Sequence, residues 1–316
     1  MLGFVLRRIA TGVATLVAVT FLMFASVAAL PGDLCAASLG KGATQGALAR
    51  CRAEFVEEGP LLARYAAWAG RAVTGDLGRS LLRRKPVAEL IAPRIVNTFA
   101  LAALAAVIAF PAAVALGVLA AIRRDSPLDL VLSAVTLIGM TVPEFVWATF
   151  LVLVFAIWLG WLPGISLLPA GAGLAQILPV IVTPALALAF ISMAHAMRLV
   201  RSAMIEELQS PYVRMARLRG LPEGRVIRAH VLPNALLPAI GIIALQFAWL
   251  LAGVVVVEVV FNYPGLGRLT MDAIADRDLT LVLGVAAVLA LIYVGVTLMA
   301  DLAMLWLNPR LRTLRT

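Results

Sequence analysis

Long apolar runs alternate with short polar segments along most of the chain. Each run is long enough to cross a bilayer as a helix, which takes about 20 predominantly apolar residues. The pattern therefore predicts an all-α integral membrane protein. It predicts six spans, at about Ile9–Leu30, Asn97–Ile122, within Leu130–Leu159, Ile177–Val200, Asn234–Phe261 and Leu279–Leu307.

The third apolar run is interrupted by the sequence "TVPEF" at Thr141–Phe145. Pro143 has no backbone N–H, so it removes one hydrogen bond from the helix ladder and its ring disturbs the preceding turn. Such a break is tolerated at membrane depth where neighbouring protein groups satisfy the freed backbone. We therefore expect a kink or a short re-entrant half-helix at this position.

The first apolar run follows Arg7 and Arg8, as the core of a secretory signal peptide would. It is longer than such a core, which has about 7–15 residues. We therefore expect Ile9–Leu30 to be an uncleaved first helix whose arginines lie in the cytoplasm.

The composition excludes a soluble domain, because 63% of the 316 residues are hydrophobic and only 14% are charged. The net charge of +9 indicates topology in such a chain and does not indicate nucleic-acid binding. Arginines are frequent in the two termini and in the connections that follow the second and the fourth span. The short loops on the opposite side hold only Arg268 and Arg277. The long segment Pro31–Val96 holds further cations, but segments of this length cross the membrane largely regardless of charge. Both termini are therefore predicted to be cytoplasmic.

The segment Pro31–Val96 carries two features of its own. Residues 61–72 place Leu, Tyr, Trp and Ala side chains near helical spacing, which predicts an amphipathic helix. This helix could lie on the outer membrane face or pack against the protein. Cys35 and Cys51 do not match a metal-ligand spacing, and they could form a disulfide or remain two free thiols.

No catalytic or nucleotide-binding pattern is found. The two lysines, Lys41 and Lys85, do not lie in a phosphate-binding G-x-x-x-x-G-K-[ST] sequence. The two histidines, His195 and His230, have no partners at metal spacing and form no triad with Ser and Asp. We therefore expect a protein that is not an enzyme and binds no cofactor or metal.

The segment between the fourth and fifth runs is basic and strongly punctuated. Ser210 and Pro211 suit a helix start with a capping hydroxyl, and Gly220 suits its end. "LPEG" then turns the chain, a second short helix follows, and Pro233 begins the next span. The result is a helix–turn–helix at the cytoplasmic face. The simpler alternative is that its arginines only hold topology or meet anionic lipid.

This segment resembles the cytoplasmic loop of ABC importer permeases, whose pattern is E-A-A-x3-G-x9-I-x-L-P. Ala216, Gly220 and Leu232–Pro233 match the pattern. Three residues depart from it: Arg214 replaces Glu, Met215 replaces Ala and His230 replaces Ile. An arginine at the glutamate position is typical of the oligopeptide/dipeptide/nickel branch.

The resemblance extends over essentially the whole chain and is closest to the subunit type with a long outer segment after the first helix. The motifs that carry it are "RRI" and "PGD" near the N-terminus, "GDLGRS" at Gly75–Ser80, "TVPEF" at Thr141–Phe145, "RLVRSAMIEEL" at Arg198–Leu208, "VVVEVVFNYPGLGRL" at Val255–Leu269 and "NPRLR" at Asn308–Arg312.

The resemblance implies the type I ABC importer permease fold in a bacterial inner membrane. It divides the chain into residues 1–95 (first helix and outer segment), a core at 96–308 containing a coupling loop at 201–233, and a tail at 309–316. The implied partners are a second homologous permease, two ATP-binding subunits that hold ATP and Mg²⁺, an extracytoplasmic binding protein and the bilayer, with no nucleic acid. The implied cargo is a peptide or a similar solute such as a nickel chelate, glutathione or an opine.

Two sets of candidate residues follow. The resemblance places ATPase coupling at Arg201, Tyr212, Val213, Ala216, Arg217, Gly220, Leu232 and Pro233. Polar residues in or beside spans are candidates for the pathway or its gate, or for structural hydrogen bonds between helices: Glu258, Glu144, Asn97 and Gln246. The rival classes are an ion-driven secondary transporter, which would require several acids at mid-membrane, and a membrane-anchored receptor or scaffold.

Overall fold

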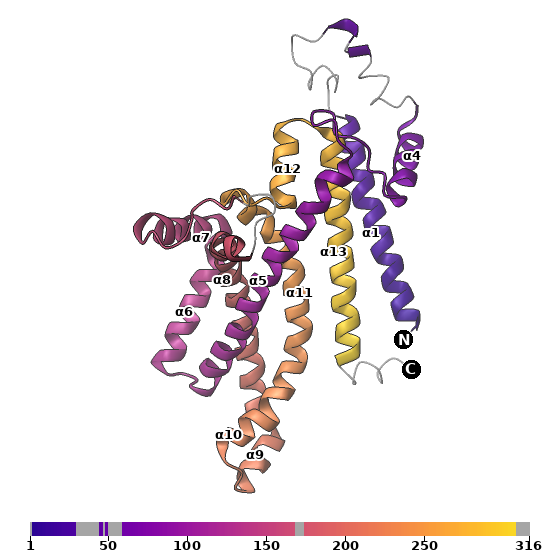
Figure 1. The fold of residues 1–316 in the computed structure, drawn as a ribbon. Helices are drawn as coiled ribbons and strands as arrows, with labels where there is room; N and C mark the ends of the chain where they lie inside the picture. The colour runs from indigo at the N-terminus through magenta and orange to yellow at the C-terminus, as the bar shows by residue number, and fades with distance from the viewer. Residues whose placement is uncertain (1, 30–43, 47, 50–58, 168–173, 308–316) are drawn as a thin grey trace. The chain divides into compact units, whose positions relative to one another are not determined.

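The computed structural model describes residues 2–29, 44–46, 48–49, 59–167 and 174–307. The elements are helical, and an isolated bridge joins Arg79 to Pro86. In chain order they are α1 (Leu2–Ala29), α4 (Leu61–Val73), α5 (Val87–Ile122), α6 (Pro127–Thr141), α7 (Glu144–Leu151), the π-helix η1 (Val152–Trp158), α8 (Leu174–Leu208), α9 (Pro211–Leu218), α10 (Glu223–Arg225), the π-helix η2 (Val226–Val231), α11 (Leu232–Val260), α12 (Leu266–Ala275) and α13 (Leu279–Leu307) (Figure 1).

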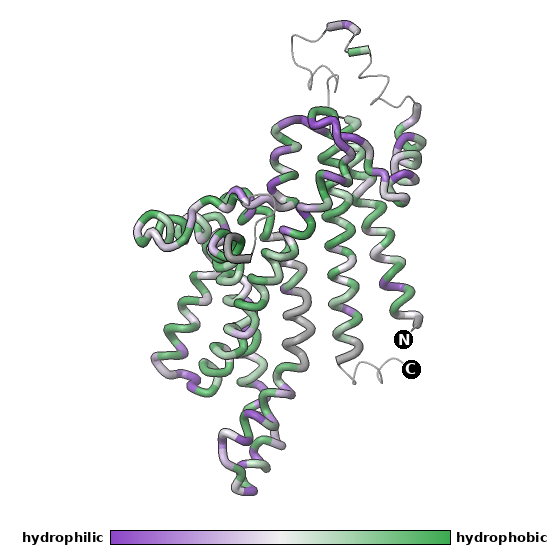
Figure 2. Tube along the Cα trace, viewed as in Figure 1, coloured by the Kyte–Doolittle hydropathy of each residue, from purple (hydrophilic) through white to green (hydrophobic). Residues whose placement is uncertain are grey.

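The long helices α5 and α13 are mostly apolar where Figure 2 colours them, whereas α9 and α10 carry many hydrophilic residues. By length and composition, four helices in the described part of the chain can cross a membrane: Val5–Ala29, Val87–Ile122, Ile177–Leu208 and Leu279–Met304. The broken pair α6 and α7–η1 adds a fifth if it is counted as one span. The expected all-helical membrane protein is thus confirmed. The number six stays a prediction, because the apolar stretch Trp249–Val260 of α11 is shorter than a membrane span.

The predicted interruption at "TVPEF" is present as a sharp bend. The axes before and after it differ by 109°. α6 ends at Thr141, Val142 and Pro143 are extended, and α7 begins at Glu144. Pro143 cannot continue the hydrogen-bond ladder of α6, and it provides the fixed φ of −58° from which α7 starts.

Contacts divide the chain into two compact units. One contains residues 99–263 and the chain from 296 onward, and the other contains residues 2–98 and 264–295. Each of α5 and α13 is divided between the two units. The predicted division at residues 95 and 308 follows function rather than contacts, and it stays a prediction.

In the unit of residues 2–98 and 264–295, α4 packs against α1. The rings of Tyr65 and Trp68 lie against Phe24, and the Tyr65 hydroxyl is 2.9 Å from Thr20 Oγ1. The amphipathic helix therefore packs against the protein, which was one of its two alternatives. A second core joins the start of α5 to α12 and α13, through Val87, Ile91, Leu266, Leu269, Ala273, Leu281, Val282 and Val285.

In the unit of residues 99–263, small residues bring α5 and α8 together. Ala113, Ala120 and Ala196 are buried between them. A Cβ on Gly117 would lie 2.9 Å from both the Met197 carbonyl oxygen and Val200 Cβ. Small residues of this kind allow helix backbones to approach closely in a membrane, where packing rather than water exclusion drives association.

We expect Gly117→Val to lower the thermal unfolding midpoint of the detergent-solubilised protein, because the added methyl groups would force α5 away from the α8 backbone. Overpacking of this kind costs about 1–3 kcal/mol. The matched control is Gly295→Val on α13, since a Cβ there meets no atom within 4 Å. Equal midpoints for the two variants in a fluorescence-monitored melt would contradict the close approach.

Candidate functional site

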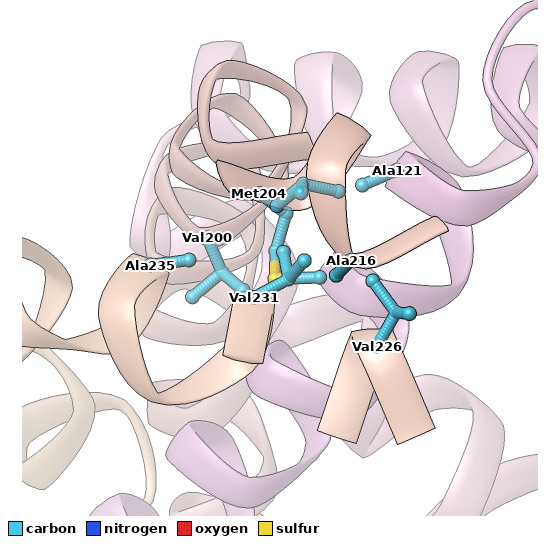
Figure 3. Close-up of a cluster of buried hydrophobic side chains, with 8 residues drawn as sticks. Ala121, Val200, Met204, Ala216, Val226, Val231 and Ala235 are labelled. Atoms are coloured by element: carbon cyan, nitrogen blue, oxygen red, sulfur yellow. The ribbon is translucent and has the colours of Figure 1, made fainter. Parts of the chain in front are cut away.

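The connection between α8 and α11 is folded around its own apolar core. Side chains from five elements meet there: Ala121 of α5, Val200 and Met204 of α8, Val213 and Ala216 of α9, Val226 and Val231 of η2, and Ala235 of α11 (Figure 3). All are buried. Two of the coupling candidates, Val213 and Ala216, are therefore the side chains by which α9 is fixed to the membrane helices.

The start of α9 differs in one detail from the prediction. Ser210 has the extended backbone of an N-cap residue and Pro211 occupies the first helical position. The Ser210 side chain, however, makes no capping hydrogen bond. The backbone carbonyl of Ser210 accepts from the Arg214 N–H at 3.3 Å. The helix therefore begins through this backbone hydrogen bond and Pro211, without the serine hydroxyl.

The predicted end at Gly220 is confirmed by its geometry. Gly220 has φ +78°, in the left-handed region that favours glycine. Its N–H donates to the Arg217 carbonyl at 2.9 Å, and the Leu221 N–H donates to the Ala216 carbonyl at 3.3 Å. These are the two hydrogen bonds of a Schellman motif, which satisfies carbonyls at a helix end.

The second half of the connection is continuous with the next long helix, which corrects the expectation of a separate short helix. α10, η2 and α11 follow one another without a break from Glu223 to Val260. Pro233 lies in the first turn of α11, directly after the π-helical turn of η2. Proline has no backbone N–H to contribute to the helix ladder, and it is tolerated in the first turn of an α-helix.

α9 presents a mixed apolar and cationic face outward. Met215 and Leu218 are 53% and 76% exposed, and Arg214 and Arg219 are exposed beside them. Interfaces between proteins commonly combine apolar side chains and arginine in this way. The outward face of α9 is therefore the surface of this segment best suited to a protein partner.

Tyr212 links three elements at the base of α9. Its hydroxyl donates to Glu207 Oε1 at 2.6 Å and lies 3.2 Å from the His230 carbonyl oxygen. The Asn234 side-chain amide donates to the same hydroxyl at 3.2 Å. Burial, and then the bond to Glu207, raise the pKa of Tyr212, so the phenol keeps the proton that it donates.

Arg217 closes the turn after α9. Its Nε and Nη2 donate to the two carboxylate oxygens of Glu223 at 3.1 and 2.6 Å. This hydrogen-bonded cation lowers the pKa of Glu223. Both side chains are largely exposed, so the pair mainly sets the shape of the turn.

Arg201 faces inward, toward α6. Its Nε donates to Asp129 Oδ1 at 2.6 Å and its Nη2 donates to Asp129 Oδ2 at 2.7 Å. The Asp129 side chain is only 4% exposed, and it also accepts from the Asp125 N–H and the Ser133 hydroxyl. Arg201 therefore positions the end of α8 against α6, and its guanidinium is already engaged within the chain.

Sequence reasoning did not identify Asp129. The available signal was "SPLD", in which Ser126 and an acid three residues later form a helix-start pattern. Ser126 does accept from the Asp129 N–H at 3.3 Å. The Asp129 carboxylate accepts from the Asp125 N–H near the start of α6, and it also binds Arg201 of α8.

The remaining coupling candidates lie at the start of α11. Leu232 packs at the edge of the α9 core, and Pro233 is exposed. Cys35 and Cys51 lie outside the described residues. Within the described residues, no group of three or more His, Cys, Asp or Glu side chains could hold a metal ion.

The pathway candidates occupy different surroundings. Glu258 is fully buried near the end of α11, and its backbone carbonyl accepts from the Tyr263 N–H at 2.8 Å. The Glu144 carboxylate packs against α11, where a Cβ on Gly253 would lie 2.8 Å from its Oε1. Asn97 donates to the Pro264 carbonyl at 2.8 Å, a bond between elements of one unit. Gln246 is half-buried on α11.

Two family models match the chain. The model described as "Binding-protein-dependent transport system inner membrane component" matches residues 113–313, and its N-terminal companion matches residues 1–102. Together they account for most of the chain, including the α9 segment.

Relatives match at nearly full length. A protein of Brucella abortus named as a peptide transport system permease protein is 34% identical over 99% of both chains. A peptide permease protein of Brucella suis is 36% identical over 99% of both chains, and the oligopeptide transport system permease protein AppB of Bacillus subtilis is 33% identical over 98% of this chain and 99% of its own.

A solved structure described as an amino acid ABC transporter with histidines shares the fold. Its TM-score is 0.53 at 18% identity, covering 68% of this chain and 93% of that chain.

We expect Arg201→Ala and Asp129→Ala to destabilise the protein by about 3 kcal/mol each, because either change leaves one charge of a largely desolvated pair without its partner. Replacing both residues with apolar side chains, as Asp129→Leu with Arg201→Met, should recover much of the loss. Thermal melts of the three variants in detergent test this. Additive losses in the double variant would show that the two side chains do not depend on each other.

Proposed function

The chain belongs to the family of binding-protein-dependent transport system inner membrane components, and from this premise we propose that it forms half of the membrane pathway of an ATP-driven peptide importer. It is an ABC importer permease of the bacterial inner membrane. The proposal extends this to its partners, its orientation and the residues that couple it to ATP hydrolysis.

The observation that carries the proposal is the folded α9 platform, meaning α9 with the core of Figure 3 beneath it. A connection that only fixed topology would need a few arginines and no packed core. Here two buried side chains, a Schellman end and the Tyr212 and Arg217 hydrogen bonds hold α9 in place. Because α9 is held in this way, a partner could bind it and move it without first having to order it.

In this proposal six spans place both termini and α9 in the cytoplasm. The arginines of the α9 segment support this side, because cations near spans favour the cytoplasmic face. Two ATP-binding subunits hold ATP and Mg²⁺, and one of them seats α9. A second, related permease completes the pathway, and a soluble binding protein delivers the solute from outside.

The mechanism follows from the stiffness of the platform. When ATP draws the two ATP-binding subunits together, α9 moves with the subunit that holds it. The α9 core and the Arg201–Asp129 pair pass this movement to α8 and α6 as a rigid-body shift. Opening then alternates between the two sides of the membrane, while the energy comes from the partners.

The relatives' names support a peptide as cargo. A nickel chelate, glutathione or an opine remains the alternative within the same transport role. The binding protein would make most of this selection, so identifying the solute that co-purifies with it distinguishes these cargoes.

An ion-driven secondary transporter is the rival from another class. Such a protein would use several acids along its route, and the two candidates here are Glu144 and Glu258. Glu258 is fully buried. Uptake into proteoliposomes by the two permeases without the ATP-binding subunits would favour the rival, whereas uptake that requires ATP and all subunits supports the proposal.

We expect Gly220→Val to reduce co-purification of the ATP-binding subunits to less than about half, because a β-branched residue is strained at positive φ and would disturb the end of α9. Gly220→Asn should be milder, since Asn adopts this backbone more readily.

The matched control is Gly224→Val in the same segment. Gly224 has no positive φ, and a Cβ there meets only the end of the flexible Arg228 side chain, at 3.4 Å. All three variants should reach the membrane at wild-type amounts. Wild-type recovery of the ATP-binding subunits with Gly220→Val would contradict the role of this helix end.

A further inference from the structure

A tight hairpin between α4 and α5 displays a cluster of cations. It is formed by residues 76–86 and is called here the basic hairpin. The Ser80 N–H donates to the Lys85 carbonyl at 2.9 Å, and the Arg84 N–H donates to the Ser80 carbonyl at 3.0 Å. Arg79 and Pro86 form the isolated bridge. The backbone of this hairpin is therefore well defined by its own hydrogen bonds.

The basic hairpin is anchored by a buried polar contact. Ser80 and Asp278 are both fully buried, and the Ser80 hydroxyl donates to the Asp278 carboxylate. The other oxygen of Asp278 accepts from the Leu281 N–H at the start of α13, at 3.1 Å. The Arg83 N–H donates to Ser80 Oγ at 3.0 Å, so one serine joins the turn to α13. The hairpin is thus held to the α12–α13 turn within one unit.

Four cations lie within seven residues of this hairpin, at Arg79, Arg83, Arg84 and Lys85. The side chains of Arg79, Arg84 and Lys85 are exposed. Arg83 is paired with Asp276 at 3.5 Å, so its charge is partly balanced. The tip adds Leu82, which is 48% exposed.

Two features show that the tip has a set shape. Arg79 Nη2 donates to the Arg84 carbonyl at 3.1 Å, which braces the turn. Arg84 has φ +52°, a left-handed conformation that costs a non-glycine residue about 1–2 kcal/mol. The acidic Asp76 at the other end of the hairpin is exposed and accepts from the Gly78 N–H at 2.9 Å. The exposed charged side chains at the tip itself, Arg84 and Lys85, are cationic.

Topology does not account for these cations. In the proposed orientation, on which this inference rests, the basic hairpin lies outside the cytoplasm, where spans are usually flanked by fewer arginines and lysines. The hairpin follows a long outer segment, and such segments cross regardless of charge. A rigid, cationic tip with one exposed leucine instead has the composition of a docking surface.

We propose that the basic hairpin is a docking point for an acidic patch on the soluble binding protein of this transport system. Arg84 and Lys85 supply the exposed charge, Leu82 supplies an apolar contact, and the Ser80–Asp278 anchor keeps them in place. Charge of this kind raises the rate of encounter and selects the orientation of the partner. A bilayer surface could also attract the tip, and the test separates that outcome.

The test measures binding of the purified binding protein to the assembled transporter in nanodiscs of phosphatidylcholine. The double variant Arg84→Glu/Lys85→Glu should raise the Kd about tenfold at low salt, and the difference should shrink to about threefold or less near 0.5 M salt, where exposed charges are screened. The charge-retaining pair Arg84→Lys/Lys85→Arg should bind as the wild type does. Glu89→Lys, an exposed change of opposite sign at the start of α5, should bind equally or more tightly.

Basal ATP hydrolysis should be the same in all variants, which shows that the transporter remains assembled. An unchanged Kd in the reversed variant overturns the proposal. A change that occurs only in nanodiscs containing phosphatidylglycerol also overturns it, because the tip would then bind lipid. The proposed function itself fails on a different result, namely no stimulation of ATP hydrolysis in the wild-type transporter by its binding protein.

Discussion

The pairing of Asp129 with Arg201 is the constraint on which the candidate site depends. An ionised carboxylate that is only 4% exposed must be matched by a cation or by hydrogen bonds, and Asp129 has both. Arg201 provides two parallel hydrogen bonds, a geometry that lysine cannot supply. The pair therefore fixes the start of α6 relative to the end of α8, where the platform for α9 begins.

The α9 platform extends this constraint outward. Its apolar core joins the ends of α5 and α8 to the start of α11, so α9 packs directly against the side chains of these helices. Tyr212 adds a polar connection between α8, η2 and α11. In the proposed mechanism, these contacts connect a short helix outside the apolar spans to a bent span. α6 carries the pair at one end and the 109° bend at Pro143 at the other.

Local sequence signals predicted the local features well. Apolar run length predicted the long helices, Pro143 the bend, Pro211 the start of α9 and Gly220 its end, because each depends on the backbone chemistry of one or two residues. Partners distant in sequence could not be predicted. Asp129 and Arg201 are 72 positions apart, and Ser80 and Asp278 are 198 apart, so no periodicity or spacing joins them. The π-helical turn before Pro233 was also missed, since its ladder depends on how η2 packs on the α9 core.

The central claim is that the outward face of α9 meets an ATP-binding subunit. Site-directed cross-linking tests it most directly, after Cys35 and Cys51 are replaced by serine. Leu218→Cys, at the most exposed apolar position of α9, should form a cross-linked product with an ATP-binding subunit in native membranes. Val73→Cys, which is 89% exposed on α4, should form none. Absence of the product at Leu218, with intact ATP-driven uptake by the same variant, would contradict the account.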